Sequence, residues 1–171
     1  MQDDRPGFSI RRARTPDVRR IGELVSGYAD VRILLHKETV TYYEDVQEFR
    51  VAVDPSDQVI GCGAMHVLWE DLAEIRTLAV DSAWHGRGVG HRLLDALIDQ
   101  ARWIGVRRVF CLTFEVDFFA KHGFVEIEGT PVSPEIFAEM LRSHDEGVAE
   151  FLDLARVKPN TLGNSRMLLE F

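Results

Sequence analysis

The sequence predicts an α/β protein with a mixed central sheet that is flanked by helices. Short apolar segments typical of strands recur along the chain, and amphipathic segments with helical spacing lie between them. One apolar strand also runs through a glycine-rich turn directly into a helix. Alternating strands and helices are typical of α/β folds, and strands joined by tight turns add antiparallel pairs. The expected order is β-α-α-β-β-β-α-β-α-β.

The expected strands are apolar segments that end at turn residues. Two of them flank the turn at residues 54–57, which contains a proline and two aspartates, and Glu70-Asp71 marks a second hairpin. The predicted strands are residues 8–12, 50–53, 59–69, 73–80, 108–112, 124–127 and 167–170.

The expected helices begin at capping residues or show apolar residues on one face. Thr15 offers a capping hydroxyl and Pro16 fits the first helical position, so a helix should begin there. Ser133 and Pro134 repeat this pattern later in the chain. Other helices are expected within residues 32–45, at 88–104 and at 116–121.

Composition and charge narrow the classes of partner. With 171 residues, 46% of them hydrophobic, the chain is long enough to fold as one soluble globular domain. No apolar run approaches the ~20 residues of a membrane span, so no membrane partner is expected. A net charge of −8 argues against nucleic acid as a partner.

Cysteine usage points to the cytoplasm. Cys62 and Cys111 lie in apolar segments without metal-ligand spacing, so we expect two reduced core thiols and no metal site. No cleavable signal precedes Arg5, which agrees with a cytoplasmic location.

Three closely spaced glycines lie at the start of the longest predicted helix. Gly86, Gly88 and Gly90 follow the strand, and such glycines let backbone N–H groups approach a phosphate at the positive end of the helix dipole. By itself the spacing also fits a flexible turn. The dinucleotide fingerprint requires a glycine where this chain has His91, and the Gly-Lys-Ser/Thr end of a P-loop is absent. We therefore expect a pyrophosphate-binding loop.

The whole run from Glu74 to Leu94 resembles the acetyl-CoA loop of the GCN5-related N-acetyltransferases (GNAT). Their pattern Gln/Arg-x-x-Gly-x-Gly/Ala follows a Leu-x-Val strand, and here His85 stands where glutamine or arginine is usual. Residues 118–124 resemble the late Phe-Tyr-x-x-x-Gly-Phe motif of the same family. The resemblance implies the GNAT acyl-CoA N-acyltransferase fold, with acetyl-CoA as co-substrate. It implies these cofactor-binding residues: Leu78, Ala79, Val80, His85, Gly86, Arg87, Gly88, Val89, Gly90 and His91.

The C-terminal part resembles the end of the N-acetylglutamate synthases. Pro134-Glu135 and the segment 164–168 match their Leu-Pro-Glu and closing-strand segments, and Val31-Arg32-Ile33-Leu34 resembles their early Ile-Arg-Pro-Leu segment. The similarity is to the short actinobacterial form, a single domain with a core at about 8–128 and a substrate-side extension at about 129–171. The longer type carries an amino-acid-kinase domain, for which we expect no room here, so arginine control through that domain is not assumed.

This resemblance implies a set of acceptor-binding residues. Arg32 matches the arginine that grips the α-carboxylate of glutamate, and Ser165 matches a serine of the closing strand. The basic residue before that serine falls at Gly163, so its contact is missing or is supplied by Arg166. A lysine near the γ-carboxylate falls at His66, whose imidazole pairs with a carboxylate only when protonated but bonds to an amide in either state. Glutamate and glutamine therefore both remain as acceptors.

Glu74 is the expected general base, because an amine must lose its proton before it attacks a thioester. The alternative is a solvated residue at the end of a hairpin. Arg76 lies on the same face and either orients substrate or pairs with Glu74. The resemblance also implies that the oxyanion donor is a backbone N–H of this strand near Leu78. Phe119 replaces the tyrosine that many relatives use as acid, so we expect it to pack, and the acid is not identified.

The expected activity is transfer of acetyl from acetyl-CoA to the α-amine of L-glutamate, or of L-glutamine, the first step of arginine biosynthesis. The partner is then a small-molecule amino acid, and a homodimer is plausible. One alternative is a GNAT that acetylates another amine, such as a polyamine or a protein N-terminus. A second is a catalytically silent acyl-CoA-binding module, which Phe119 favours. Dinucleotide binding is a weaker third.

Overall fold

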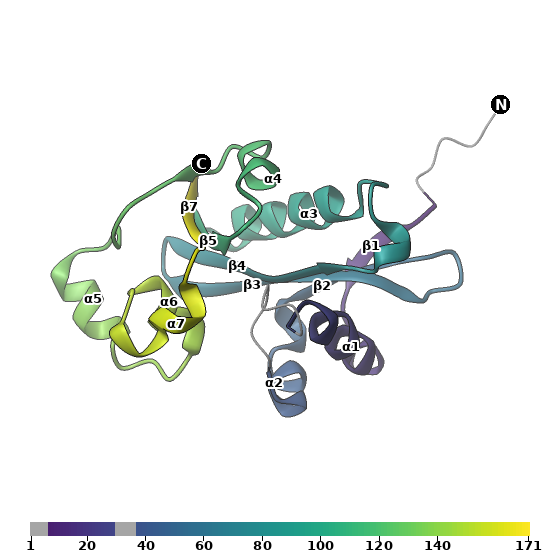
Figure 1. The fold of residues 1–171 in the computed structure, drawn as a ribbon, viewed down its shortest axis with the longest axis horizontal. Coiled ribbons are helices and arrows are strands. Elements are labelled where there is room, and N and C mark those ends of the chain that lie inside the picture. The colour runs from purple at the N-terminus through teal and green to yellow at the C-terminus, as the bar shows by residue number, and fades with distance from the viewer. Residues whose placement is uncertain (1–6, 30–36) are drawn as a thin grey trace. The chain divides into compact units, whose positions relative to one another are not determined.

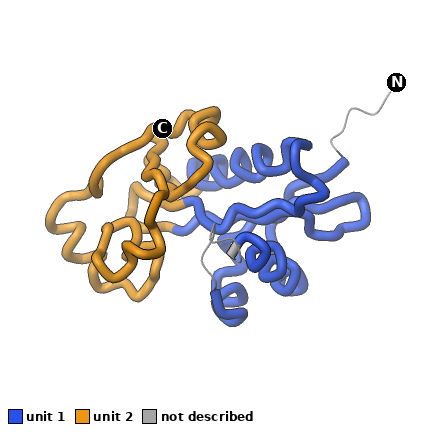
Figure 2. The backbone as a smooth tube through the Cα atoms, in the orientation of Figure 1, with its two compact units in different colours: residues 1–66, 75–103 blue, residues 67–74, 104–171 orange. Residues whose placement is uncertain are grey.

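The computed structural model describes residues 7–29 and 37–171 of the chain. The chain divides into two compact units, which Figure 2 shows in different colours. The first unit comprises residues 1–66 and 75–103, and the second comprises residues 67–74 and 104–171. In the part of the chain that the structure describes, no helix is both long and apolar enough to cross a membrane.

Seven strands form one sheet in the order β1-β2-β3-β4-β5-β7-β6, and the mixed sheet expected from the sequence is confirmed. Strands β1, β2 and β3 pair antiparallel, β4 pairs parallel with β5, and β7 pairs antiparallel with both β5 and β6. The strands are β1 (Ser9–Arg12), β2 (Phe49–Val53), β3 (Val59–Trp69), β4 (Leu72–Val80), β5 (Arg108–Thr113), β6 (Val125–Glu126) and β7 (Ser165–Glu170).

Seven α-helices accompany the sheet in the described residues. They are α1 (Val18–Ala29), α2 (Thr39–Glu44), α3 (Val89–Ile104), α4 (Val116–Ala120), α5 (Pro134–Met140), α6 (Glu146–Phe151) and α7 (Lys158–Thr161). The short helices α6 and α7 were not predicted, because each is barely longer than one helical turn and offers no periodicity to recognise.

The start of α1 differs from the prediction. A 3-10 turn at Thr15–Asp17 precedes the helix, and its N-cap is Arg14 rather than Thr15. The carboxylate of Asp17 accepts a hydrogen bond from the backbone N–H of Arg14 at 2.7 Å. Asp17 also accepts two hydrogen bonds from Arg11, so a partly buried ion pair closes this turn where we expected a threonine hydroxyl.

In the first unit, helices cover both faces of the strands (Figure 1). Helices α1 and α2 lie on one face, and α3 lies on the other. The α1 side buries Val18, Ile21, Leu24, Val25, Tyr42, Phe49, Val51, Val53, Val59, Cys62, Ala64 and Ala79. The α3 side buries Phe8, Ala52, Ile60, Val89 and Leu93. The amphipathic pattern of α3 is thereby explained, since its apolar face packs on the sheet.

Two glycines of β3 allow α3 to lie close to the sheet. A Cβ at Gly63 would meet side-chain carbons of Leu97 and Leu78 at 2.8 and 2.9 Å, and one at Gly61 would meet Leu93 at 3.0 Å. Real Cβ atoms do not approach other carbons so closely, so a side chain at Gly63 would push α3 outward. The position of the α3 N-terminus therefore depends on these glycines.

In the second unit, helices pack against β5 and β7. The core contains Leu68, Leu72, Phe110, Met140, Val148, Phe151, Leu152 and Leu168. Phe110 of β5 and Phe151 of α6 meet edge to face, with ring centroids 5.0 Å apart. Phe119 of α4 is buried and packs against Phe124, which confirms the packing role expected for it.

We predict that Gly63→Val destabilises the protein by about 1–3 kcal/mol, because the new side chain overpacks the contact between β3 and α3. Denaturant unfolding followed by circular dichroism measures this change. Gly7→Val is the matched control, since a Cβ at Gly7 meets nothing within 4 Å. Equal effects of the two substitutions would show that the close approach of α3 does not depend on Gly63.

Candidate active site

The loop that leads from β4 into α3 is held in one conformation by its first residue. The backbone N–H of Asp81 donates to the carbonyl of Ile60 in β3 at 2.8 Å. Its carboxylate accepts from the N–H of Ala83 at 2.9 Å and so caps the 3-10 turn Ser82–Trp84. Arg20 of α1 also pairs with this carboxylate, at 2.5 Å. The loop therefore leaves β4 at a fixed point and angle.

The glycines of the loop adopt backbone conformations that suit an anion site. Gly86 and Gly88 have φ angles of 75° and 79°, a region that residues with a Cβ rarely adopt. Helix α3 then begins at Val89, and its first turn brings the N–H groups of Val89, Gly90 and His91 to the helix N-terminus. Such N–H groups and the helix dipole together attract phosphate.

The side chains of the predicted cofactor residues divide into two groups. Those of Ala79 and Val89 are buried in the core, so these residues can offer a ligand only their backbone groups. The side chain of Arg87 is exposed, and its Cζ lies 4.8 Å from the centroid of the Trp84 ring. Arg87 has the only side chain between Asp81 and Gly90 whose positive charge does not depend on pH. The cation–π contact holds this charge beside the loop.

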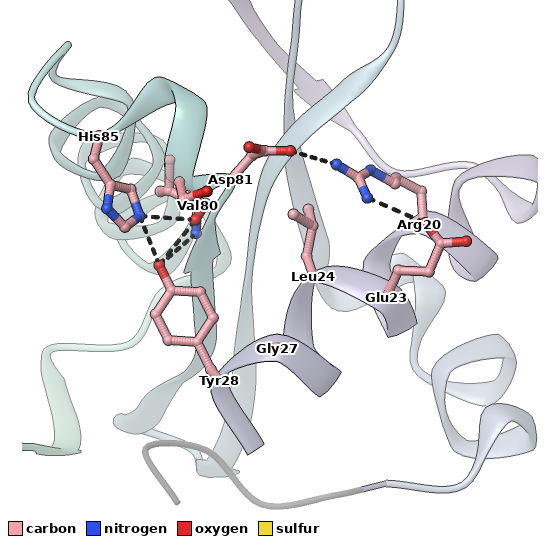
Figure 3. Close-up of a pocket in the computed structure, with 9 residues that line it drawn as sticks. Arg20, Glu23, Leu24, Gly27, Tyr28, Val80, Asp81 and His85 are labelled. Atoms are coloured by element: carbon pink, nitrogen blue, oxygen red, sulfur yellow. Dashed lines mark hydrogen bonds and ion pairs between the residues drawn. The ribbon is translucent and has the colours of Figure 1, made fainter. Parts of the chain in front are cut away.

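The end of β4 carries a compact group of polar contacts with α1 (Figure 3). The hydroxyl of Tyr28 donates to the carbonyl of Val80 at 2.9 Å and accepts from the N–H of Val80 at 3.3 Å. Nε2 of His85 lies 3.0 Å from both the hydroxyl and the same carbonyl. These residues border a pocket of about 390 Å³. Its lining is Arg20, Glu23, Leu24, Gly27, Tyr28, Val80, Asp81, Ser82 and His85.

Glu74 is buried rather than solvated. Its exposed fraction is 3%, and it pairs with Phe110 in the parallel register of β4 and β5. The pKa of the nearby Cys111 thiol is raised, first by burial and then by the negative charge of Glu74. The alternative of a solvated hairpin residue is therefore excluded, and a buried carboxylate remains at the start of β4.

Thr77 is a feature of β4 that the sequence did not reveal. Its φ angle is 60°, which is unusual for a β-branched residue, and its side chain is buried. Strained backbone of this kind occurs at functional sites, where the surrounding structure holds it. The residue lies between Glu74 and the loop, directly before Leu78, where the expected contacts with the cofactor begin.

His66 belongs to a charged cluster in the first unit. Its Nδ1 lies 2.7 Å from Oε1 of Glu48, and both side chains are about one quarter exposed, at 23% and 25%. The pKa of Asp45 is raised by burial and by Glu48, while the charges of Lys37, His66 and Arg76 oppose that shift. Glu48 was missed by the sequence analysis, because nothing in its local pattern places it beside His66.

Ser165 and Arg166 lie in the second unit at the start of β7. They border a pocket of about 500 Å³, which is lined by Glu126, Ile127, Glu128, Gly129, Asn164, Ser165 and Arg166. The guanidinium of Arg166 is largely occupied. It donates to the carbonyls of Gly129, Glu150 and Phe151 through four of its five N–H groups, and burial lowers its pKa. A contact between Arg166 and the substrate would therefore have to compete with these hydrogen bonds to backbone carbonyls.

The predicted site residues divide between the two units. The first unit contains His66, Arg76 and the glycine loop, and the second contains Glu74, Ser165 and Arg166. Arg32 lies outside the described residues. Both cysteines are free and buried, as we expected, and burial raises the pKa of Cys62 to about 12. Within residues 7–29 and 37–171, no group of three or more His, Cys, Asp or Glu side chains is placed to hold a metal.

Residues 15–124 match the model of the acetyltransferase (GNAT) family. The chain belongs to this family, which confirms the family expected from the loop and the late phenylalanine motif. It is 62% identical over 162 residues to an amino-acid acetyltransferase of Mycobacterium tuberculosis, and the match covers 94% of this chain and 92% of that protein. An acetyltransferase of the amino-acid type, expected from the C-terminal segments, is confirmed by this relationship.

Longer relatives match over part of their length. An amino-acid acetyltransferase of Neisseria meningitidis is 35% identical over 118 residues, which are 68% of this chain and 27% of that protein. The chain thus spans about a quarter of that relative.

Solved structures agree with this relationship. Rv2747 from Mycobacterium tuberculosis, in complex with CoA and a second ligand, has a TM-score of 0.93 and 61% identity, and the match covers 95% of this chain and 99% of that one. N-acetylglutamate synthase from Neisseria gonorrhoeae, complexed with coenzyme A and N-acetyl-glutamate, has a TM-score of 0.75 and 25% identity over 95% of this chain and 35% of that one. The expected GNAT fold is confirmed.

We predict that Arg166→Ala lowers the free energy of unfolding by about 2–4 kcal/mol, because it removes four charge-assisted hydrogen bonds to the carbonyls of Gly129, Glu150 and Phe151. Arg166→Lys should recover little, since an ammonium cannot reproduce the planar fork of a guanidinium. Arg142, exposed and paired only with its neighbour Glu139, provides the control, with a loss near 0.5 kcal/mol or less on substitution by alanine. Unchanged stability together with a raised KM for the acceptor would make Arg166 a substrate ligand instead.

Proposed function

We propose that the chain transfers acetyl from acetyl-CoA to the α-amine of L-glutamate or L-glutamine, the first step of arginine biosynthesis. The observation that carries this proposal is the layout of β4, which holds a buried carboxylate at Glu74 and leads into the glycine loop after Val80. The names of the relatives support the same reaction. We further propose that residues 1–171 act as one cytoplasmic GNAT domain that binds neither nucleic acid nor membrane, and a homodimer stays a prediction.

Backbone groups would provide most of the cofactor site. The N–H groups at the start of α3 would hold the pyrophosphate, and Arg87 would add a positive charge beside it. The backbone of Leu78, Ala79 and Val80 would hold the pantetheine arm. This division agrees with a loop whose glycines are left-handed and whose apolar side chains are buried.

The reaction needs one proton to leave the acceptor before attack. Glu74 would accept it, directly or through water, and the neutral amine would then attack the thioester carbonyl. A backbone N–H near Leu78 would donate to the oxyanion of the tetrahedral intermediate. Collapse of that intermediate breaks the C–S bond and releases the CoA thiolate, while the nitrogen loses its second proton to water and leaves a neutral amide. Because Phe119 is buried and has no proton to give, the proposed acid is water or another, unidentified residue.

The acceptor would be bound through its α-carboxylate and through the carboxylate or carboxamide of its side chain. Arg32 is proposed for the α-carboxylate, and Ser165 is proposed as a further acceptor contact from the closing strand. Arg76 either orients the acceptor or pairs with Glu74. His66 is proposed to face the end of the acceptor side chain. Its imidazole pairs with a carboxylate only when protonated but bonds to a carboxamide in either state, so glutamine stays an acceptor beside glutamate.

Release of free CoA thiol from acetyl-CoA tests the proposal, with the twenty amino acids, spermidine and a peptide N-terminus as acceptors. Turnover confined to glutamate and glutamine is the expected result. Turnover with spermidine or the peptide alone would contradict the proposed amino-acid acceptor but support acetyl-CoA as the co-substrate. Tight binding of acetyl-CoA without turnover would indicate a silent acyl-CoA-binding module.

Glu74→Gln should lower kcat about 10²- to 10⁴-fold, because the amide cannot accept the proton of the acceptor. The loss should be greatest at low pH, where more of the amine is protonated, and should shrink as the pH rises. Affinity for acetyl-CoA should not change. Glu70→Gln removes an exposed carboxylate four residues earlier and should leave the pH profile as it is. A Glu74→Gln profile that is parallel to the wild type would exclude Glu74 as the base.

His66→Lys should raise kcat/KM for glutamate relative to glutamine by about tenfold, because a lysine keeps its positive charge beside Glu48. The ratio of the two kcat/KM values, measured at one pH, reports the change. His144→Lys adds the same charge at an exposed position and should leave the ratio constant. If His66→Lys also leaves it constant, the His66 side chain does not face the acceptor.

A further inference from the structure

The backbone groups of Val80 are already fully used within the protein. A peptide N–H offers one hydrogen, and that of Val80 points to the hydroxyl oxygen of Tyr28 at 3.3 Å. A carbonyl oxygen offers two lone pairs. At Val80 the Tyr28 hydroxyl takes one at 2.9 Å, and Nε2 of His85 lies at 3.0 Å from the same oxygen. With a hydrogen on Nε2, every donor in this group has an acceptor.

These contacts lie on the edge of β4 that faces away from β3. The N–H of the next residue, Asp81, points to Ile60 of β3, and successive peptide groups of a strand point to opposite sides. The N–H and C=O of Val80 therefore point away from β3. The hydroxyl of Tyr28 in α1 occupies both backbone groups. An extended ligand with amide groups could bind the same groups, because they lie at the edge of a strand.

The Tyr28 hydroxyl has the same bonding capacity as a secondary amide of pantetheine. It donates once and accepts once at Val80, as an amide N–H and C=O would. Tyr28 is half-buried and lines the pocket beside Gly27, and its ring packs against the margin of the α1 core (Figure 3). Displacement of its hydroxyl therefore requires the ring to give up part of this contact.

We propose that the Tyr28 hydroxyl is a displaceable substitute for the pantetheine arm. It satisfies the N–H and C=O of Val80 in the free enzyme and leaves them when acetyl-CoA binds. This inference rests on the proposed function, since it takes β4 as the pantetheine site. Its consequence is a built-in competitor, which lowers the affinity for CoA and so speeds release of CoA after acetyl transfer.

Tyr28→Phe tests this role, because it removes the competing hydroxyl and keeps the ring. The variant should bind CoA about three- to tenfold more tightly, which corresponds to the loss of hydrogen bonds that only the free enzyme makes. Titration calorimetry measures the Kd. Tyr43→Phe removes a hydroxyl from an exposed tyrosine of α2 and should not change it.

A second ligand separates the pantetheine position from the nucleotide site. 3′-Phospho-ADP carries the nucleotide and pyrophosphate of CoA but no pantetheine arm, so its Kd should be the same for wild type and Tyr28→Phe. Tighter binding of both ligands, or weaker or unchanged binding of CoA, would overturn the proposal. If the wild type fails to bind CoA at all, the proposed function falls with it.

Hydrogen exchange at Val80 gives a direct structural readout by NMR. In the free wild type, the Val80 amide should be protected by the Tyr28 hydroxyl. Tyr28→Phe should lose that protection, and CoA should restore it in the variant. Full protection of Val80 in the free variant would show that Tyr28 is not its partner and would overturn the proposal.

Discussion

The hydrogen bond from Asp81 to Ile60 fixes the point where β4 ends, and the geometry of the glycine loop depends on it. From that point the Asp81 carboxylate closes the next turn through Ala83 and binds Arg20 of α1. The helix that follows can approach β3 because Gly61 and Gly63 have no side chains. The N-terminus of α3, with its phosphate-attracting N–H groups, is therefore placed by backbone bonds and close packing rather than by flexible side chains.

Burial decides what the charged side chains of this chain can do. The chain has a net charge of −8, with acidic side chains in excess of basic ones. The Glu74 side chain is nevertheless buried in the second unit, with an exposed fraction of 3%. Its place on the strand that leads into the glycine loop is the reason for proposing it as the general base. Arg166 illustrates the opposite case, because its charge is used to bind three carbonyls and to face the Phe110 ring at 4.9 Å.

The sequence predicted the parts of the fold and site that depend on local pattern. The seven strands, the long helix α3 and the glycine loop have clear periodicity or special backbone residues. It missed features that depend on contacts between distant segments. Glu48 meets His66 across 18 residues and Tyr28 meets Val80 across 52, and neither pair has a sequence signal. It also missed a local feature, since Asp17, through its bonds with the nearby Arg11 and Arg14, replaces the threonine cap expected at Thr15.

Carbon NMR with acetyl-CoA labelled at the acetyl carbonyl tests the central claim most directly. In the presence of the enzyme and glutamate or glutamine, the labelled thioester signal should be replaced by one amide signal, coupled to the nitrogen of α-¹⁵N-labelled acceptor. That coupling would place the acetyl group on the α-amine, by direct transfer. A label that appears on the protein, on another nitrogen, or only as free acetate would contradict the account.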